Sequence, residues 1–220
     1  MSFLNQYGEM LLVATGETLY MTFFAALFSY LLGLPMGVLA YTSDKDSIAP
    51  NRTVNLVLGW IINIGRSIPF MILIVALIPF TRLVVGKAIG PTAAIVPLTI
   101  GAAPFVARMV ETSLKEVDRG VIESSRAMGA TNFQIVWNVL LPETLPSILR
   151  GVSIAAITIV GYTAMAGAVG GRGLGDIAIR YGYHRYEYGV MLATIVILLV
   201  LVQIIQVAFN VLSKRIDKNR

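Results

Sequence analysis

The sequence predicts an all-α integral membrane protein with five transmembrane helices, and three observations lead to this fold class. Of the 220 residues, 56% are hydrophobic and only 13% are charged. The mean hydropathy is +0.77, which is not the value of a soluble domain. Five long stretches carry no charge or a single one, and none shows the alternation of a β-barrel strand. Such stretches cross a bilayer as helices, because the bilayer core contains no water to bond to the backbone N–H and C=O groups, and a helix satisfies these groups internally.

Each of the five stretches has about 20 residues or more, the length that a helix needs to cross the hydrocarbon core. The predicted spans are approximately 18–42, 55–80, 90–113, 145–170 and 189–212. Gly33, Pro35 and Gly37 are expected to bend the first helix or to let a neighbour approach closely. The second span contains one charge, Arg66, which we expect inside the span or close to its cytoplasmic end. Its guanidinium would pair with a helix-end carbonyl or extend to the membrane surface.

The distribution of basic residues predicts the orientation of these spans. If the N-terminus lies outside, 11 of the 17 Lys and Arg residues fall on the cytoplasmic side and 5 fall outside. This bias follows the positive-inside rule and places residues 114–142 and the C-terminus in the cytoplasm. No Lys or Arg precedes Lys45, as expected for an N-terminal tail that is translocated across the membrane. The tail also lacks the basic residues with which a cleavable signal peptide begins. The net charge of +5 is therefore a topology signal, and no nucleic-acid partner is needed to explain it.

The loop between the third and fourth spans is polar, and it predicts two short helices. Asp118 is a suitable N-cap for the first helix, and Gly129 stands where a left-handed glycine follows a helix. Thr131 and Gln134 have the spacing of a capping box that begins the second helix, which Pro142 is expected to end. Helices of about ten residues are marginal in water, so their apolar faces need a partner. That partner is either the membrane-spanning helices or a second protein.

This loop resembles a known family motif. Glu123, followed by Gly129 and then by Leu141 and Pro142, resembles the EAA loop of the membrane subunits of ATP-binding-cassette (ABC) importers. Two serines stand where two alanines are usual, and these small residues preserve close packing. The resemblance implies that the first short helix is a coupling helix, which docks in a cleft of a cytoplasmic ATPase subunit and transmits its closure. The residues implied in ATPase coupling are Glu123, Ser124, Ser125, Arg126, Ala127, Met128, Gly129 and Ala130.

Longer blocks are similar to one branch of this family, the methionine importer permeases. They are RSIPF (66–70), IPFTR (78–82), AIVPLT (94–99), GAAPF (101–105), ARMVE (107–111), GYTAMAGAVG (161–170) and GLG (173–175). The resemblance implies a non-catalytic permease subunit that moves L- or D-methionine, or a derivative, across the bacterial cytoplasmic membrane by alternating access. The implied partners are a second copy of this chain, two cytoplasmic ABC ATPase subunits and an extracytoplasmic methionine-binding lipoprotein. ATP and Mg²⁺ would be bound by the ATPase, and this chain would hold no cofactor or metal.

The fourth span supplies candidates for the solute path. Five helices offer too little surface to enclose a path alone, so we expect it between two copies related by a two-fold axis. Small residues recur at the spacing of close helix contacts, either between copies or within one chain: Gly161, Ala164, Gly167 and Ala168. Tyr162 and Met165 are predicted to wall the path, and for Met165 the alternative is a place in the core. Arg66 is expected to support the cytoplasmic gate.

The sequence also limits the alternatives. No P-loop is present, and the spans are expected to carry no Asp or Glu that could couple transport to protons or sodium. Zero cysteines and a single histidine, His184, leave little for metal chemistry. Residues 170–175 fit neither nucleotide fingerprint and predict a flexible turn, whereas residues 179–187 are typical of a membrane anchor or a docking surface. Two other functions stay open: a permease of the same superfamily for another amino acid, and an ATP-independent carrier or channel.

Overall fold

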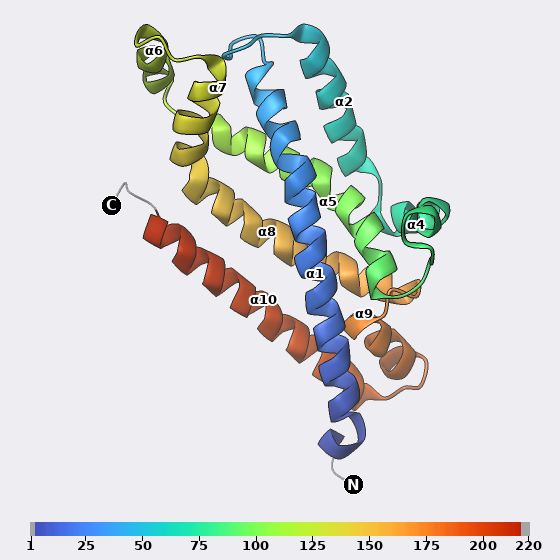
Figure 1. The fold of residues 1–220 in the computed structure, drawn as a ribbon. Helices are drawn as coiled ribbons and strands as arrows, with labels where there is room; N and C mark the ends of the chain where they lie inside the picture. Colours follow the sequence, from blue (N-terminus) through green and yellow to red (C-terminus); the bar gives the residue numbers. More distant parts are fainter. Residues whose placement is uncertain (1–2, 217–220) are drawn as a thin grey trace.

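The computed structural model describes residues 3–216, and every regular element in this range is helical (Figure 1). The long helices are α1 (Phe3–Thr42), α5 (Pro91–Leu114), α8 (Leu141–Ala168) and α10 (Tyr188–Ile216). The shorter ones are α2 (Arg52–Ser67), α3 (Phe70–Ala76), α4 (Ile78–Val85), α6 (Arg119–Ala127), α7 (Asn132–Ile135) and α9 (Gly173–Ile177). Two π-helical turns, η1 (Val136–Leu140) and η2 (Ala178–Tyr183), extend α7 and α9. The predicted all-α fold class is confirmed.

Four helical segments are long and apolar enough to cross a membrane: Gln6–Thr42, Pro91–Leu114, Asn132–Ala168 and Tyr188–Ile216. The predicted second span is present as a broken pair, because α2 and α3 meet at an angle of 102°. Ile68 is extended, with φ −79° and ψ 123°, as a residue before a proline tends to be, and Pro69 precedes the new helix. The described residues therefore contain four candidate spans, or up to five if the bent pair counts as one.

α1 runs along most of the length of the molecule and packs mainly against α5 (Figure 1). Its 40 residues rise about 60 Å, roughly twice the hydrocarbon core, so the helix extends well beyond residues 18–42. A Cβ added to Gly33 would lie 2.7 Å from Val106 Cγ1, and one added to Gly37 would lie 2.7 Å from Val110 Cβ. The predicted close approach of a neighbouring helix at these glycines is therefore confirmed.

Four buried apolar clusters hold the described helices together, and two of them bear on the sites discussed below. One lies among α1, α3, α5 and α8 and includes Met21, Phe70, Leu98 and Ile159. The other joins the end of α5 to α6, α7 and η1 and includes Leu114, Ile122, Ile135 and Leu140. The second cluster fixes α6 to the long helices, and α6 lies at the opposite end of the molecule from the start of α1 (Figure 1).

The prediction that Pro142 ends the second short helix is wrong. The helical segment is continuous from Asn132 to Ala168, and η1 joins α7 to α8 within it. In this π-helical turn the N–H of Leu141 bonds to the carbonyl of Val136, five residues back instead of four. The wider turn changes the hydrogen-bond register directly before the proline, which has no N–H to donate. The π-helical turn therefore accommodates Pro142 inside this continuous helical segment.

Candidate functional site

The best-defined surface feature is the segment of residues 118–131, which contains α6 and the turn after it. The Asp118 carboxylate accepts the N–H of Gly120 at 2.6 Å and caps the start of α6, as predicted. A complete capping box between Thr131 and Gln134 begins α7, also as predicted. Both ends of the segment are thus fixed by side-chain caps that satisfy backbone N–H groups.

The turn after α6 is fixed by backbone hydrogen bonds. Gly129 follows the helix with φ +84°, which confirms the predicted left-handed glycine. Its N–H bonds to the carbonyl of Arg126 at 2.9 Å, and the N–H of Ala130 bonds to the carbonyl of Ser125 at 3.1 Å. These two bonds are the Schellman arrangement, in which the last carbonyls of a helix are satisfied by the residues beyond it.

One side of α6 is anchored and the other is open. Ile122 is buried in the cluster with Leu114, and Ser125 is buried with its hydroxyl bonded to the carbonyl of Val121 at 2.8 Å. Ala130 is half-buried. The remaining residues of the predicted motif are exposed, namely Glu123, Ser124, Arg126, Ala127, Met128 and Gly129. Met128 is 81% exposed, and a flexible thioether beside small residues suits contact with another protein.

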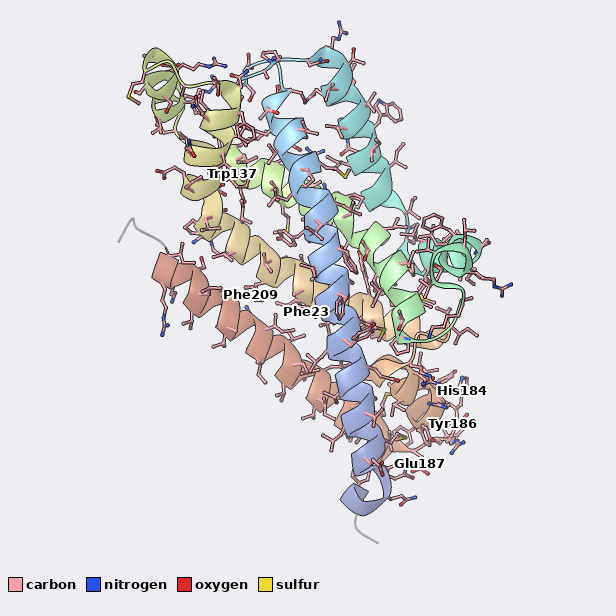
Figure 2. All side chains as sticks on the ribbon, in the orientation of Figure 1. Phe23, Trp137, His184, Tyr186, Glu187 and Phe209 are labelled. Atoms are coloured by element: carbon pink, nitrogen blue, oxygen red, sulfur yellow. The ribbon has the colours of Figure 1, made fainter. Side chains whose placement is uncertain are left out.

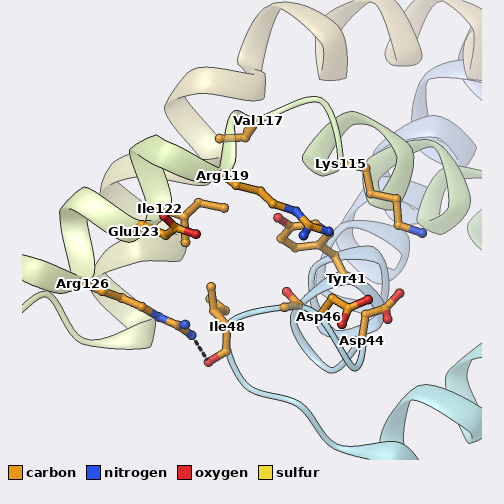
Figure 3. A pocket seen from close by; sticks show the side chains of 11 residues that line it. Tyr41, Asp44, Asp46, Ile48, Lys115, Val117, Arg119, Ile122, Glu123 and Arg126 are labelled. Atoms are coloured by element: carbon orange, nitrogen blue, oxygen red, sulfur yellow. Dashed lines mark hydrogen bonds between the residues drawn. The ribbon is translucent and has the colours of Figure 1, made fainter.

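A charged cavity of about 380 Å³ lies between α6 and the loop after α1 (Figure 3). Its walls include three acidic and three basic side chains: Asp44, Asp46, Glu123, Lys115, Arg119 and Arg126. Arg126 donates from Nη2 to the carbonyl of Ile48 at 2.6 Å, so α6 is tied to the loop that leads into α2 (Figure 3). Glu123 and Arg126 were indicated by the sequence motif. Asp44 and Asp46 were missed, because no local pattern connects them to α6.

A smaller cavity of about 150 Å³ lies at the break between α2 and α3. Tyr162 of α8 stacks on Phe70 of α3, with ring centroids 4.3 Å apart and ring planes at 5°. Arg66, in the last turn of α2, lines the same cavity as Tyr162. Met165 lies one turn further along α8 and is 44% exposed, outside the wall of this cavity. The structure thus brings together two of the three residues predicted to line the path.

The prediction of a flexible turn at residues 170–175 is wrong. Three of its glycines are buried, and a Cβ added to Gly175 would overlap the backbone of Ala164 in α8. The N–H of Leu174 donates to the hydroxyl of Thr18 in α1 at 2.9 Å. Gly175 is required because the backbone of α9 packs directly on the backbone of α8, whereas Gly173 packs against Thr18 and Met21 of α1.

The small residues of α8 divide between two faces. Ala164 and Gly167 contact α9, so packing within the chain accounts for both. Gly161 has no atom of the described chain within 4 Å of an added Cβ, and Ala168 is exposed. Together with Met165, these two residues form what we term the open face of α8.

The prediction that no span carries Asp or Glu is wrong. Glu111 lies in α5, within the candidate span Pro91–Leu114, and it is only 6% exposed. Arg108 of α5 and Lys115, which directly follows α5, each place a nitrogen 2.7 Å from a Glu111 oxygen. Such pairing reduces the cost of burying a carboxylate, and a window of mean hydropathy does not detect it.

The opposite end of the molecule carries aromatic and charged side chains. His184, Tyr186 and Glu187 lie there, close to the start of α1 (Figure 2). The guanidinium of Arg185 lies over the ring of Tyr181, 4.5 Å from its centroid. Aromatic rings combined with basic groups are typical of a membrane interface or of a protein contact, so both interpretations of this loop stay open.

The fold and these sites define a class of protein: a multi-pass helical membrane subunit that presents a short, well-ordered helix at one end. The chain belongs to the family described as binding-protein-dependent transport system inner membrane component, which matches residues 29–218. It is therefore the permease component of an ABC importer, a non-catalytic subunit whose ATPase is a separate partner.

Named relatives cover nearly the whole chain. The probable D-methionine transport system permease protein MetI of Vibrio cholerae is 54% identical over 210 residues, 96% of this chain and 93% of that protein. The methionine import system permease protein MetP of Bacillus subtilis is 44% identical over 205 residues, 93% and 92% of the two chains. A solved chain of the inward-facing MetNI methionine ABC transporter has a TM-score of 0.96 at 49% identity, and the match covers 99% of this chain and 100% of that one.

Proposed function

We propose that this chain is the permease subunit of an ATP-driven importer that moves L- or D-methionine across the bacterial cytoplasmic membrane. One observation carries the proposal: the match to a chain of a methionine ABC transporter, with a TM-score of 0.96 over 99% of this chain. Two relatives at 54% and 44% identity, both named for methionine transport, support the same substrate.

The proposed orientation places the N-terminus outside and α6 in the cytoplasm, where it acts as the coupling helix. Basic residues concentrate in the loops at the α6 end, as the positive-inside rule requires. The start of α1 and α6 lie at opposite ends of the molecule, which suits this orientation (Figure 1). The exposed Glu123 and Met128 would contact the ATPase. The bond from Arg126 to Ile48 would pass a displacement of α6 to the loop before α2.

The proposed mechanism is alternating access by two copies of the chain. Closure of two ATPase subunits on ATP would draw the two α6 helices together and open the path to the outside. Hydrolysis would then return the path to the inward-facing state. ATP and Mg²⁺ are bound by the ATPase in this proposal, and the permease chain needs no cofactor of its own. An extracytoplasmic methionine-binding lipoprotein would deliver the substrate.

The proposed path lies between the two copies, along the open face of α8. Met165 and the adjacent Tyr162 would wall it, because a thioether can repack around a passing apolar side chain. Arg66 lines the cavity at the α2–α3 break and would support the path on its cytoplasmic side. A wall of this composition has few groups that bind a zwitterion, so selectivity would rest mainly on the binding protein.

Reconstitution tests the proposal. The chain, its ATPase and its binding protein are placed in proteoliposomes, with ATP on the ATPase side and labelled methionine with the binding protein on the other. We expect uptake that requires both ATP and the binding protein and that unlabelled methionine suppresses. ATP-dependent uptake of a different amino acid, with methionine excluded, would identify another permease of the superfamily. Uptake without ATP would identify a self-sufficient carrier, and either result would refute the proposal.

A further inference from the structure

A polar network joins α5 to α2 shortly before α2 ends. Both carboxylate oxygens of the buried Glu111 have a cationic partner. Arg108 Nη1 lies 2.7 Å from Oε2, and Lys115 Nζ lies 2.7 Å from Oε1. The other terminal nitrogen of Arg108 donates to the side-chain oxygen of Asn63 in α2, also at 2.7 Å. Glu111 therefore fixes the guanidinium that holds α2.

Close packing adds a second attachment between the same two helices. Gly65 of α2 lies against Pro104 of α5, where an added Cβ would be 2.5 Å from the proline Cγ. Within α2, the hydroxyl of Ser67 donates to the carbonyl of Asn63 at 2.8 Å. One polar and one steric contact thus hold the last turns of α2 to α5, directly before the break at Ile68.

One member of the network borders the same cavity as α6. Lys115 lines the charged cavity together with Glu123 and Arg126 of α6 (Figure 3). Arg126 bonds to the carbonyl of Ile48 in the loop that leads to the start of α2. α2 is therefore tied to α6 at its start, through this loop, and to α5 near its end, through Arg108 and Glu111.

We infer that Glu111 is a positioning residue that keeps α2 and α5 moving as one body when α6 is displaced. The inference rests on the proposed function, in which α6 is the coupling helix. A displacement of α6 then reaches the α2–α3 break, where Arg66 and Tyr162 line one cavity. Without the Glu111 carboxylate, Arg108 loses its counter-charge and its fixed orientation toward α2. ATP would still be hydrolysed, but less of the movement would reach the path.

The test compares three variants in the reconstituted complex of permease, ATPase and binding protein. Glu111→Gln keeps the side-chain shape and removes the charge. Asn63→Ala removes only the α2 end of the network and leaves Glu111 paired, so it remains informative if the first variant folds poorly. Asp176→Asn is the control, because it breaks another ion pair within one helical segment, with Arg180 at 2.6 Å, far from α2. Methionine uptake and ATP hydrolysis are measured in the same vesicles.

We expect Glu111→Gln and Asn63→Ala to lower the methionine taken up per ATP hydrolysed about tenfold, while the rate of hydrolysis is retained. The double variant should be no worse than Glu111→Gln alone, since both changes break one link. The control should keep the ratio of the unmodified chain. An unchanged ratio in both variants would overturn the inference, and so would an equal loss of uptake and hydrolysis.

Spin labels give a readout that does not depend on the transported solute. The chain contains no cysteine, so Ile64→Cys, at an exposed position of α2, provides one label in each copy. ATP binding should change the distance between the two labels, and Glu111→Gln should suppress this change while ATP still binds. A full distance change in Glu111→Gln would refute the role of Glu111. If the labels respond in this way but methionine is not taken up, only the proposed substrate fails.

Discussion

Gly129 ends α6, and replacing it isolates the energetic cost of one backbone conformation. Its φ of +84° lies in the left-handed region, where a residue with a side chain loses about 1–2 kcal/mol relative to glycine. No described atom lies within 4 Å of an added Cβ, so the cost of Gly129→Ala is backbone strain without steric overlap. Such a loss lowers the ratio of the formed to the open turn by a factor of roughly 5 to 30. Gly129→Asn should cost less, because asparagine tolerates this region, and Gly129→Val should cost more.

Hydrogen exchange measures this change where it occurs. In the formed turn the N–H of Ala130 is bonded to the carbonyl of Ser125. In Gly129→Ala this amide should exchange faster by the same factor, because the turn opens more often. In the reconstituted transporter, the same opening should weaken the contact between α6 and the ATPase, and uptake of methionine should fall with it.

Gly59→Ala is the matched control for this prediction. Gly59 also has no atom within 4 Å of an added Cβ, but it lies inside α2 without a positive φ. Alanine at this position should stabilise the helix by about 0.5–1 kcal/mol. The reasoning is refuted if Gly129→Ala and Gly59→Ala change exchange and uptake in the same direction. It also fails if alanine, asparagine and valine at position 129 behave like glycine.

Two further substitutions test the contacts of α9. Gly175→Ala should destabilise the protein by about 1–3 kcal/mol, because its Cβ would overlap the backbone of α8. Gly161→Ala adds a Cβ that meets no other part of its own chain and should leave the fold of that chain unchanged, and thermal unfolding in detergent compares the two variants. Thr18→Val removes the hydroxyl that accepts the N–H of Leu174 and should cost about 1–3 kcal/mol, since a buried donor is left unsatisfied. The control in the same unfolding experiment is Thr15→Val, which loses only the bond from its hydroxyl to a carbonyl of its own helix. Equal losses of stability in the two variants would contradict the prediction.

The ends of α6 were predictable from the sequence because their determinants are local. Asp118, Gly129 and the pair of Thr131 and Gln134 act over two to four residues, on backbone groups of the same turn. The structure confirms all of them. The surroundings of the helix were not predictable in this way. Asp46 reaches the charged cavity only because the loop after α1 folds beside α6.

The course of α2 and α3 was harder to predict, because mean hydropathy measures composition and not direction. Residues 55–80 are apolar enough for one span, although the chain turns by 102° within them. Pro69 was visible in the sequence, but a proline is compatible with a kink as well as with a break. Pro142 is the opposite case. It was expected to end a helix, but it lies inside a continuous helical segment because a π-helical turn directly precedes it.

Glu111 was missed for a related reason. An acidic residue close to the end of an apolar stretch is normally assigned to the adjoining loop. Arg108 and Lys115 stand three residues before it and four residues after it, a spacing that could have indicated a neutralised carboxylate at the end of the predicted span 90–113. The contact between Arg108 and Asn63 joins residues 45 positions apart and has no local signal. The link between α5 and α2 is therefore visible only in the structure.

The small residues of α8 show how one sequence pattern can serve two different contacts. Successive helical residues differ by about 100°, so Ala164 and Gly167 share one face, while Gly161, Met165 and Ala168 share the next. α9 fills the first face, whereas Gly161 has no described neighbour on the second. Spacing alone could not separate the two faces, because close approach requires small residues on both. Once α9 accounts for the first face, only the second remains for a second copy of the chain. Changes on that face should therefore alter the pairing of copies and the solute path, and changes on the other should alter the fold of a single chain.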